Sequence, residues 1–471
     1  MTLRTWSTLA GLALAGAVYA ATWQIGLPAA QSWTAAVTVL CMTWWVLEAL
    51  PSAATALVPL VVFPFAGVLK ERQVAAAYGD PVILLFMGAF MASKAVEHWG
   101  AHRRIAHALM ARIGSTSGPR ILLALMLATT LCSFWINNTA IALMMMPVAL
   151  AALEHDKSGK LAVPLLLGVA YCASIGGIAT PIGTAPNGVF QFNYQEVTGQ
   201  TIPFHEWIIV GSVVTFLMMG AAWAVLSWGV RGVPAVHIPA GGQWTAAQIR
   251  TLIVFGLAAL AWITREVPFG GWSNLLPHTF DANEGDMCVA VAAALFMFFI
   301  PSGEKDGGRL LDWKTAASIP WGVLILFGGG IAIASAFKSS GLSEIIGQTV
   351  TGIQDWPLLA LIAVLCLVTT FLSEVTSNTA TANILMPILA AAAIANGMEP
   401  ALLMFPATLS NSLAFMIPVG TPPNAIAYGS GHVRIIDMVR YGFVLNLIGV
   451  VIVTLVCWKL LPVVFGVTAT N

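Results

Sequence analysis

Charged residues are scarce in this sequence. Only 8% of its 471 residues are Asp, Glu, Lys or Arg, whereas 58% are hydrophobic. A soluble domain usually carries about a quarter charged residues, so this composition excludes a water-soluble protein. The formal net charge is zero, which implies no nucleic-acid partner. Such a chain can instead supply many apolar segments of roughly 20 residues, the length that spans a lipid bilayer.

Cysteine and histidine motifs are missing as well. The six cysteines lie in apolar stretches without Cys-x-x-Cys spacing, and the eight histidines form no His-Glu-x-x-His motif. Neither a disulfide framework nor a zinc site is therefore predicted. An intramembrane protease or lipid hydrolase would need a Ser/Lys, Asp/Asp or His-Glu-x-x-His group at membrane depth, and none is present. We therefore do not expect an enzyme.

Apolar segments bounded by charges or by Pro and Gly recur along the whole chain. Two further apolar stretches, residues 119–153 and 357–395, carry central polar clusters and proline, so each is predicted to form a re-entrant hairpin. The predicted fold class is an all-α polytopic membrane protein with about eleven transmembrane helices and two re-entrant hairpins. The predicted spans are residues 6–25, 33–50, 54–69, 82–99, 162–190, 207–229, 251–268, 286–301, 319–338, 400–428 and 441–463.

The basic residues predict an orientation. Most of the twenty Lys and Arg residues fall on the cytoplasmic side if the N-terminus lies inside, as the positive-inside rule requires. The apolar run after Arg4 has features of a cleavable signal peptide, but hydrophobic helices follow throughout, so we interpret it as an uncleaved first span. We expect a bacterial inner-membrane protein with a cytoplasmic N-terminus and an external C-terminus.

The chain matches itself at an offset of about 240 residues. Residues 82–88 match 323–329, and Pro-Ile-Gly-Thr-Ala-Pro-Asn at 181–187 matches Pro-Val-Gly-Thr-Pro-Pro-Asn at 418–424. A third match pairs the Asn-Thr-Ala sequences of the two hairpins. Hydrophobicity alone would not place these polar residues in the same order twice. Because an odd number of spans separates the copies, the second must enter the membrane from the opposite side, as in secondary transporters.

Each copy contains a helix break and a polar hairpin tip. The breaks are Gly183-Thr184-Ala185-Pro186 and Gly420-Thr421-Pro422-Pro423, where Gly and Pro free carbonyl groups that suit a small hard cation. The tips are Asn137-Asn138-Thr139 and Ser377-Asn378-Thr379, each beside a helix N-terminus, which attracts anions. One such cluster alone is more often helix packing. Two copies with matching breaks favour a site for a substrate with two anionic ends.

None of these four motifs contains Lys or Arg. A dianion inside the membrane is very costly without compensating charge, so co-bound cations are predicted, and cation coupling is favoured over simple anion exchange. Glu374 lies beside the second tip and either assists a cation site or faces a water-filled vestibule.

These motifs resemble the divalent anion:sodium symporter family, whose members share Ser-Asn-Thr clusters at hairpin tips and Gly-Thr-Pro-Pro-Asn-like breaks. The resemblance extends over nearly the whole chain. It implies sodium-coupled symport of C4-dicarboxylates (succinate, malate, fumarate) by an elevator mechanism, in a homodimer in the lipid bilayer. It also implies two or more Na⁺ ions and no organic cofactor. The alternative is a sodium-independent dicarboxylate, citrate or tartrate exchanger of the same fold.

The resemblance also implies domains and site residues. Residues 1–118 would form scaffold spans 1–4, residues 119–230 the first hairpin and transport spans 5–6, residues 231–355 scaffold spans 7–9, and residues 356–471 the second hairpin and transport spans 10–11. One Na⁺ would bind near Ser133, Asn137, Asn138 and Gly183, and another near Ser373, Thr376, Asn378 and Gly420. The dicarboxylate would contact Asn138, Thr139, Thr184, Asn378, Thr379, Thr421 and Pro422. Asn137 and Ala185 replace the family's Ser and Pro, which leaves the sodium stoichiometry open.

Overall fold

The computed structural model describes residues 3–113, 117–154, 156, 158–233, 242–267, 270–275, 282–304, 307–349 and 356–466. Within these ranges, regular structure is helical throughout, and the one β-pairing is an isolated bridge between Pro301 and Arg309. The all-α class predicted from the sequence is confirmed.

The helices follow the order of the predicted spans. The first half contains α1 (Leu3–Gln24), α2 (Ala29–Val46), α3 (Ser52–Thr55), α4 (Val58–Phe65), α5 (Glu71–Tyr78), α6 (Pro81–His98), α7 (Ala101–Ile113), α8 (Gly118–Ser133), α9 (Asn138–Leu153), α10 (Ala162–Gly176), α11 (Ala185–Thr198) and α12 (Phe204–Ser227). The second half contains α13 (Ala246–Ile263), α14 (Ala282–Phe299), α15 (Trp313–Ala316), α16 (Trp321–Ser340), α17 (Leu342–Thr349), α18 (Leu358–Val375), α19 (Asn378–Ala395), α20 (Ala401–Asn411), α21 (Pro422–Gly429) and α22 (Ile435–Val464).

The described helices include long apolar ones and two that are broken. In the described ranges, seven helical segments are long and apolar enough to cross a membrane, among them α12, α16 and α22. Two predicted spans are instead split into half-helices. The first is divided between α10 and α11, and the second between α20 and α21. Both splits lie at the Gly-Thr-x-Pro sequences, so the predicted helix breaks are confirmed.

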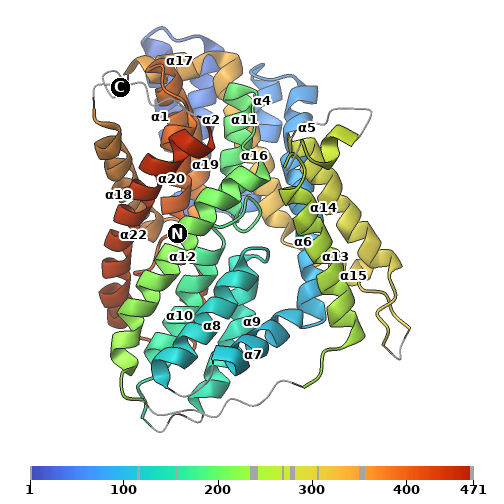
Figure 1. The fold of residues 1–471 in the computed structure, drawn as a ribbon. Helices are drawn as coiled ribbons and strands as arrows, with labels where there is room; N and C mark the ends of the chain where they lie inside the picture. The colour runs from blue at the N-terminus through green and yellow to red at the C-terminus, as the bar shows by residue number, and fades with distance from the viewer. Residues whose placement is uncertain are drawn as a thin grey trace.

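The helices pack as two groups, and the inverted repeat is visible in their contacts. In each repeat the hairpin lies on its own first half-helix, so that α8 and α9 contact α10, and α18 and α19 contact α20. Helices of one repeat also pack against helices of the other. Helix α9 contacts α21, α11 contacts α19, and α12 contacts α22. Figure 1 shows α8 and α9 in the lower part of the molecule and α19 and α20 in the upper part. This first group therefore combines both predicted hairpins with all four half-helices.

The second group surrounds the long helices α6 and α16. Helix α14 packs along α6, α1 packs along α2, and α16 contacts α2, α3, α4 and α5. The two groups meet where α11 lies against α6 and α16 and where α19 lies against α17. Helix α21 is the repeat counterpart of α11, yet within the described ranges its extensive contacts are confined to α9 and α10. The two repeats thus contain equivalent helices, but their second half-helices, α11 and α21, differ in their contacts with the second group.

Candidate functional site

The first polar cluster forms where the tip of the first hairpin meets the break between α10 and α11. Ser133 Oγ donates to the Ala173 carbonyl oxygen at 2.5 Å and lies 3.2 Å from Asn138 Oδ1. Asn138 Nδ2 in turn donates to Thr184 Oγ1 at 3.5 Å. Three predicted site residues, two from the first hairpin and one from the first break, are thereby brought together.

Two glycines allow this close approach. A Cβ atom on Gly177 would lie 2.5 Å from Asn138 Oδ1, and one on Gly183 would lie 2.6 Å from the Gly177 carbonyl oxygen. Only glycine leaves room for such contacts. Gly183 was predicted from the motif, whereas Gly177 lies outside it and was missed.

The second polar cluster is assembled differently. Ser373 Oγ donates to Asn411 Oδ1 at 2.6 Å, and Asn411 Nδ2 donates to the Asn378 carbonyl oxygen at 2.5 Å. Ser373 and Asn378 are thus brought together through Asn411, which sequence reasoning missed. The first repeat has Ser174 at the equivalent position, so comparing the repeats gave no signal for Asn411.

The Thr376 hydroxyl is already engaged in hydrogen bonds. It donates to the Leu372 carbonyl oxygen at 2.9 Å and also pairs with the Thr381 hydroxyl. Thr376 is therefore buried beside the second cluster and fixed by its own helix and the next one.

Both hairpin tips are capped helix N-termini. The Asn137 side chain accepts a hydrogen bond from the Thr139 amide at 3.0 Å, and Ser377 Oγ accepts one from the Ala380 amide at 3.2 Å. Asn and Ser are both strong N-cap residues, so Asn137 preserves the cap that the family's Ser would provide. The remaining free amides of each first turn are available to an anion.

The two helix breaks share one architecture. Asn187 Nδ2 donates to the carbonyl oxygens of Gly177 and Thr180 at 2.9 and 2.8 Å. Asn424 Nδ2 donates to those of Ala414 and Ile417, the equivalent residues of the second repeat, at 3.0 and 3.1 Å. These asparagines were not selected as site residues from the sequence, although their identity in both repeats was an available signal.

The helix that follows each break begins in the same way. Thr184 has φ −144° and ψ 153°, and Thr421 has φ −143° and ψ 145°, so both are extended N-cap residues. Neither side chain caps its own helix. Pro422 occupies the first turn of α21, where its missing N–H costs nothing.

Glu374 is buried in the second break rather than facing a vestibule. Its side chain is 4% exposed and accepts hydrogen bonds from the amides of Phe415, Met416 and Ile417, at 2.7 to 3.2 Å, and from Asn446 Nδ2 at 2.7 Å. It forms no ion pair with a described residue. The first repeat has Phe134 at this position, so the two clusters differ by one carboxylate.

Some predicted site atoms have no protein partner. Asn378 Oδ1 and Thr421 Oγ1 are buried and make no hydrogen bond. Buried polar atoms are rarely left unpaired, because each unmade bond carries a desolvation cost. An amide oxygen suits a cation and a hydroxyl suits a carboxylate, so these two atoms have the chemistry of a site for both.

Comparison with known proteins identifies the family. Residues 42–408 match the citrate transporter family. The chain is 36% identical to the sodium-dependent dicarboxylate transporter SdcS of Staphylococcus saprophyticus, over 93% of this chain and 87% of that protein. It is 35% identical to SdcS of Staphylococcus aureus strain MRSA252, over 94% of this chain and 88% of that protein. The chain therefore belongs to the citrate transporter family of membrane proteins. Its resemblance to the divalent anion:sodium symporters is thereby confirmed.

A solved structure agrees on the fold. The YdaH transporter of Alcanivorax borkumensis, described as having an unusual topology, aligns with a TM-score of 0.61 at 14% identity. The alignment covers 91% of this chain and 98% of that one. The fold is therefore that of a polytopic membrane transporter.

Proposed function

We propose that this chain is a sodium-coupled symporter that carries C4-dicarboxylates, of the succinate, malate and fumarate class, across the bacterial inner membrane. The observation that carries the proposal is the pair of repeat-related clusters, which offer oxygen donors and capped helix N-termini but no Lys or Arg. The names of its SdcS relatives, which are sodium-dependent dicarboxylate transporters, support a dicarboxylate as substrate and sodium as the coupling ion.

Each cluster holds one Na⁺ ion in this proposal. Ser133, Asn137, Asn138 and Gly183 surround the first ion, and Ser373, Thr376, Asn378 and Gly420 surround the second. Among the described residues, no group of three or more His, Cys, Asp or Glu could hold a metal ion. Neutral hydroxyl, amide and carbonyl oxygens are then the ligands, which suits a hard cation.

The dicarboxylate lies between the two tips, one carboxylate toward each. Asn138, Thr139 and Thr184 contact one end, and Asn378, Thr379, Thr421 and Pro422 line the other. The free amides of α9 and α19 and the Thr421 hydroxyl donate to the carboxylates. The two cations compensate the two negative charges, since no basic side chain in the motifs does so.

Transport follows an elevator mechanism in this proposal. The group containing both hairpins (residues 119–230 and 356–471) moves against a scaffold (residues 1–118 and 231–355) within a homodimer. The difference between α11 and α21 supports this motion, because only α11 packs extensively on α6 and α16. In the opposite state α21 would make those contacts.

Radiolabelled succinate uptake into proteoliposomes tests the proposal. An inward Na⁺ gradient should drive accumulation, whereas choline chloride of equal ionic strength should not. Uptake that ignores Na⁺ but requires succinate preloaded inside would instead establish the exchanger.

A further inference from the structure

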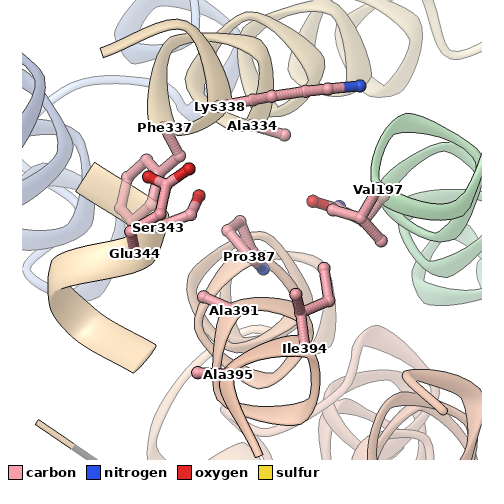
Figure 2. Close-up of a pocket in the computed structure, with 11 residues that line it drawn as sticks. Val197, Ala334, Phe337, Lys338, Ser343, Glu344, Pro387, Ala391, Ile394 and Ala395 are labelled. Atoms are coloured by element: carbon pink, nitrogen blue, oxygen red, sulfur yellow. The ribbon is translucent and has the colours of Figure 1, made fainter. Parts of the chain in front are cut away.

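A cavity lies away from the polar clusters, between α11 and α19 on one side and α16 and α17 on the other (Figure 2). Its volume is about 340 Å³. Helices α11 and α19 both begin at the clusters, but the cavity lies near their C-terminal ends. Pro387 in its wall is nine residues beyond Asn378, or about 13 Å along α19. The cavity is therefore distinct from the site described above.

The wall of this cavity is mostly apolar. Figure 2 shows Pro387 and Ile394 of α19 facing the same space as Phe337 of α16. Val197 of α11 closes the side opposite Glu344 of α17. An elongated apolar ligand would displace solvent from this wall, and burying apolar surface contributes roughly 25 cal/mol of binding free energy per Å².

The charges at its mouth are unequal. Lys338 Nζ donates to the Glu196 carbonyl oxygen at 2.6 Å and lies 3.8 Å from Glu196 Oε1, so its charge is already paired. Glu344 is exposed and has no ion pair among the described residues. The mouth therefore presents one uncompensated carboxylate.

Deeper in the cavity is a second unpaired acceptor. Asn193 is 1% exposed, and its Nδ2 donates to the Val189 carbonyl oxygen at 2.8 Å, which fixes the orientation of the amide. Its Oδ1 atom is buried and has no hydrogen-bond partner. A buried acceptor without a donor carries a desolvation cost that a ligand can relieve.

We propose that this cavity binds an aliphatic amine with hydrogen-bond donors at both ends. One ammonium group pairs with Glu344 at the mouth, the alkyl chain lies along Phe337, Pro387 and Ile394, and the inner donor bonds to Asn193 Oδ1. Such a ligand inhibits transport without competing with the dicarboxylate, because it lies between helices that the elevator must separate. This last consequence rests on the proposed function, whereas binding itself does not.

Thermal unfolding of the purified protein tests binding directly, with 8-amino-1-octanol as the probe and without succinate. This amino alcohol has one ammonium for Glu344 and a neutral hydroxyl donor for Asn193. It should raise Tm, 1-aminooctane should do so less, and 1-octanol and octanoate should not. Glu344→Gln should weaken the apparent affinity for both amines at least tenfold. Asn193→Ala should remove the advantage of the amino alcohol over 1-aminooctane. Ala391→Leu, which fills the cavity, should abolish stabilisation.

The matched control is Glu71→Gln, which removes an exposed carboxylate from α5, outside the cavity. It should bind the amino alcohol like the unmodified protein. Equal stabilisation of all variants, or stabilisation by octanoate or octanol as strong as by the amino alcohol, would overturn the proposal. If the amino alcohol binds as expected but succinate uptake fails in proteoliposomes, the inferred site is supported and the proposed function is refuted.

Discussion

Phe86 of α6 and Phe327 of α16 pack edge to face, with ring centroids 5.0 Å apart and planes at 77°. They occupy equivalent positions in the two repeats. A residue can touch its own repeat counterpart only near the axis that relates the copies. Both rings also lie against Gly188 of α11, where a Cβ atom would be 2.7 Å from Phe86 and 3.2 Å from Phe327. The pseudo-twofold axis therefore passes beside the helix that starts at the first polar cluster.

Removing one hydroxyl at either hairpin tip should weaken transport. Thr139→Val and Thr379→Val keep the side-chain shape and delete a donor. A hydrogen bond to a charged group contributes roughly 1.5–3 kcal/mol, so succinate uptake should fall at least tenfold at unchanged expression. Thr22→Val on α1, whose hydroxyl bonds only within its own helix, is the control. Near-normal uptake by both tip variants would exclude the tips from the substrate site.

The two motif glycines should respond differently to alanine. A Cβ on Gly183 would meet the Gly177 backbone oxygen at 2.6 Å, which cannot move without distorting the break. A Cβ on Gly420 would meet its nearest atoms, in Glu374 and Ala414, at 3.3 to 3.4 Å. Gly183→Ala should abolish uptake and lower Tm, whereas Gly420→Ala should retain the folded protein with a small loss. Indistinguishable Tm values and uptake rates in the two variants would contradict this account.

Sodium and succinate should raise each other's affinity by the same factor, because coupling between two binding sites is reciprocal. Asn378→Ala should lower both affinities together, since this side chain is proposed to contact cation and anion alike. Asn138→Ala should do the same in the first repeat, less severely because Asn137 already departs from the family pattern.

The measurement is succinate-dependent thermal stabilisation in sodium chloride and in choline chloride at equal ionic strength. Equal stabilisation in both salts would refute sodium coupling and favour the exchanger.

Glu374→Gln should destabilise the second break. The carboxylate accepts three backbone amides and the Asn446 side chain. A glutamine amide would turn its NH₂ group toward some of those donors, and each lost bond to a charged group costs roughly 1.5–3 kcal/mol. Tm in sodium-free buffer should fall by several degrees, and half-saturation by Na⁺ should need a higher concentration. Glu71→Gln serves as the surface control, and an unchanged Tm in Glu374→Gln would remove Glu374 from the break.

The sequence predicted the helix breaks well because their cause is local. Gly183 and Pro422 interrupt a helix whatever surrounds them, and the repeat showed each break twice. The role of Asn411 could not be predicted, because it depends on packing between α18 and α20 and has no counterpart in the first repeat. The hydrogen bonds of Thr376 were inaccessible for a similar reason, since a side-chain rotamer follows from its tertiary neighbours. The division into scaffold and transport domains remains a prediction.

Helices α11 and α21 have unequal surroundings, so their side chains must suit two different environments. Residues 185–194 of α11 are all buried, whereas Ala425 and Tyr428 of α21 are exposed. If the repeats exchange places during transport, every such side chain must be compatible with an exposed position at one time and with a packed interface at another. Alanine and tyrosine satisfy both conditions, because neither carries a charge and tyrosine keeps a polar hydroxyl at its tip. A substitution in α11 or α21 that suits only the buried or only the exposed position would therefore favour one state and slow the transport cycle.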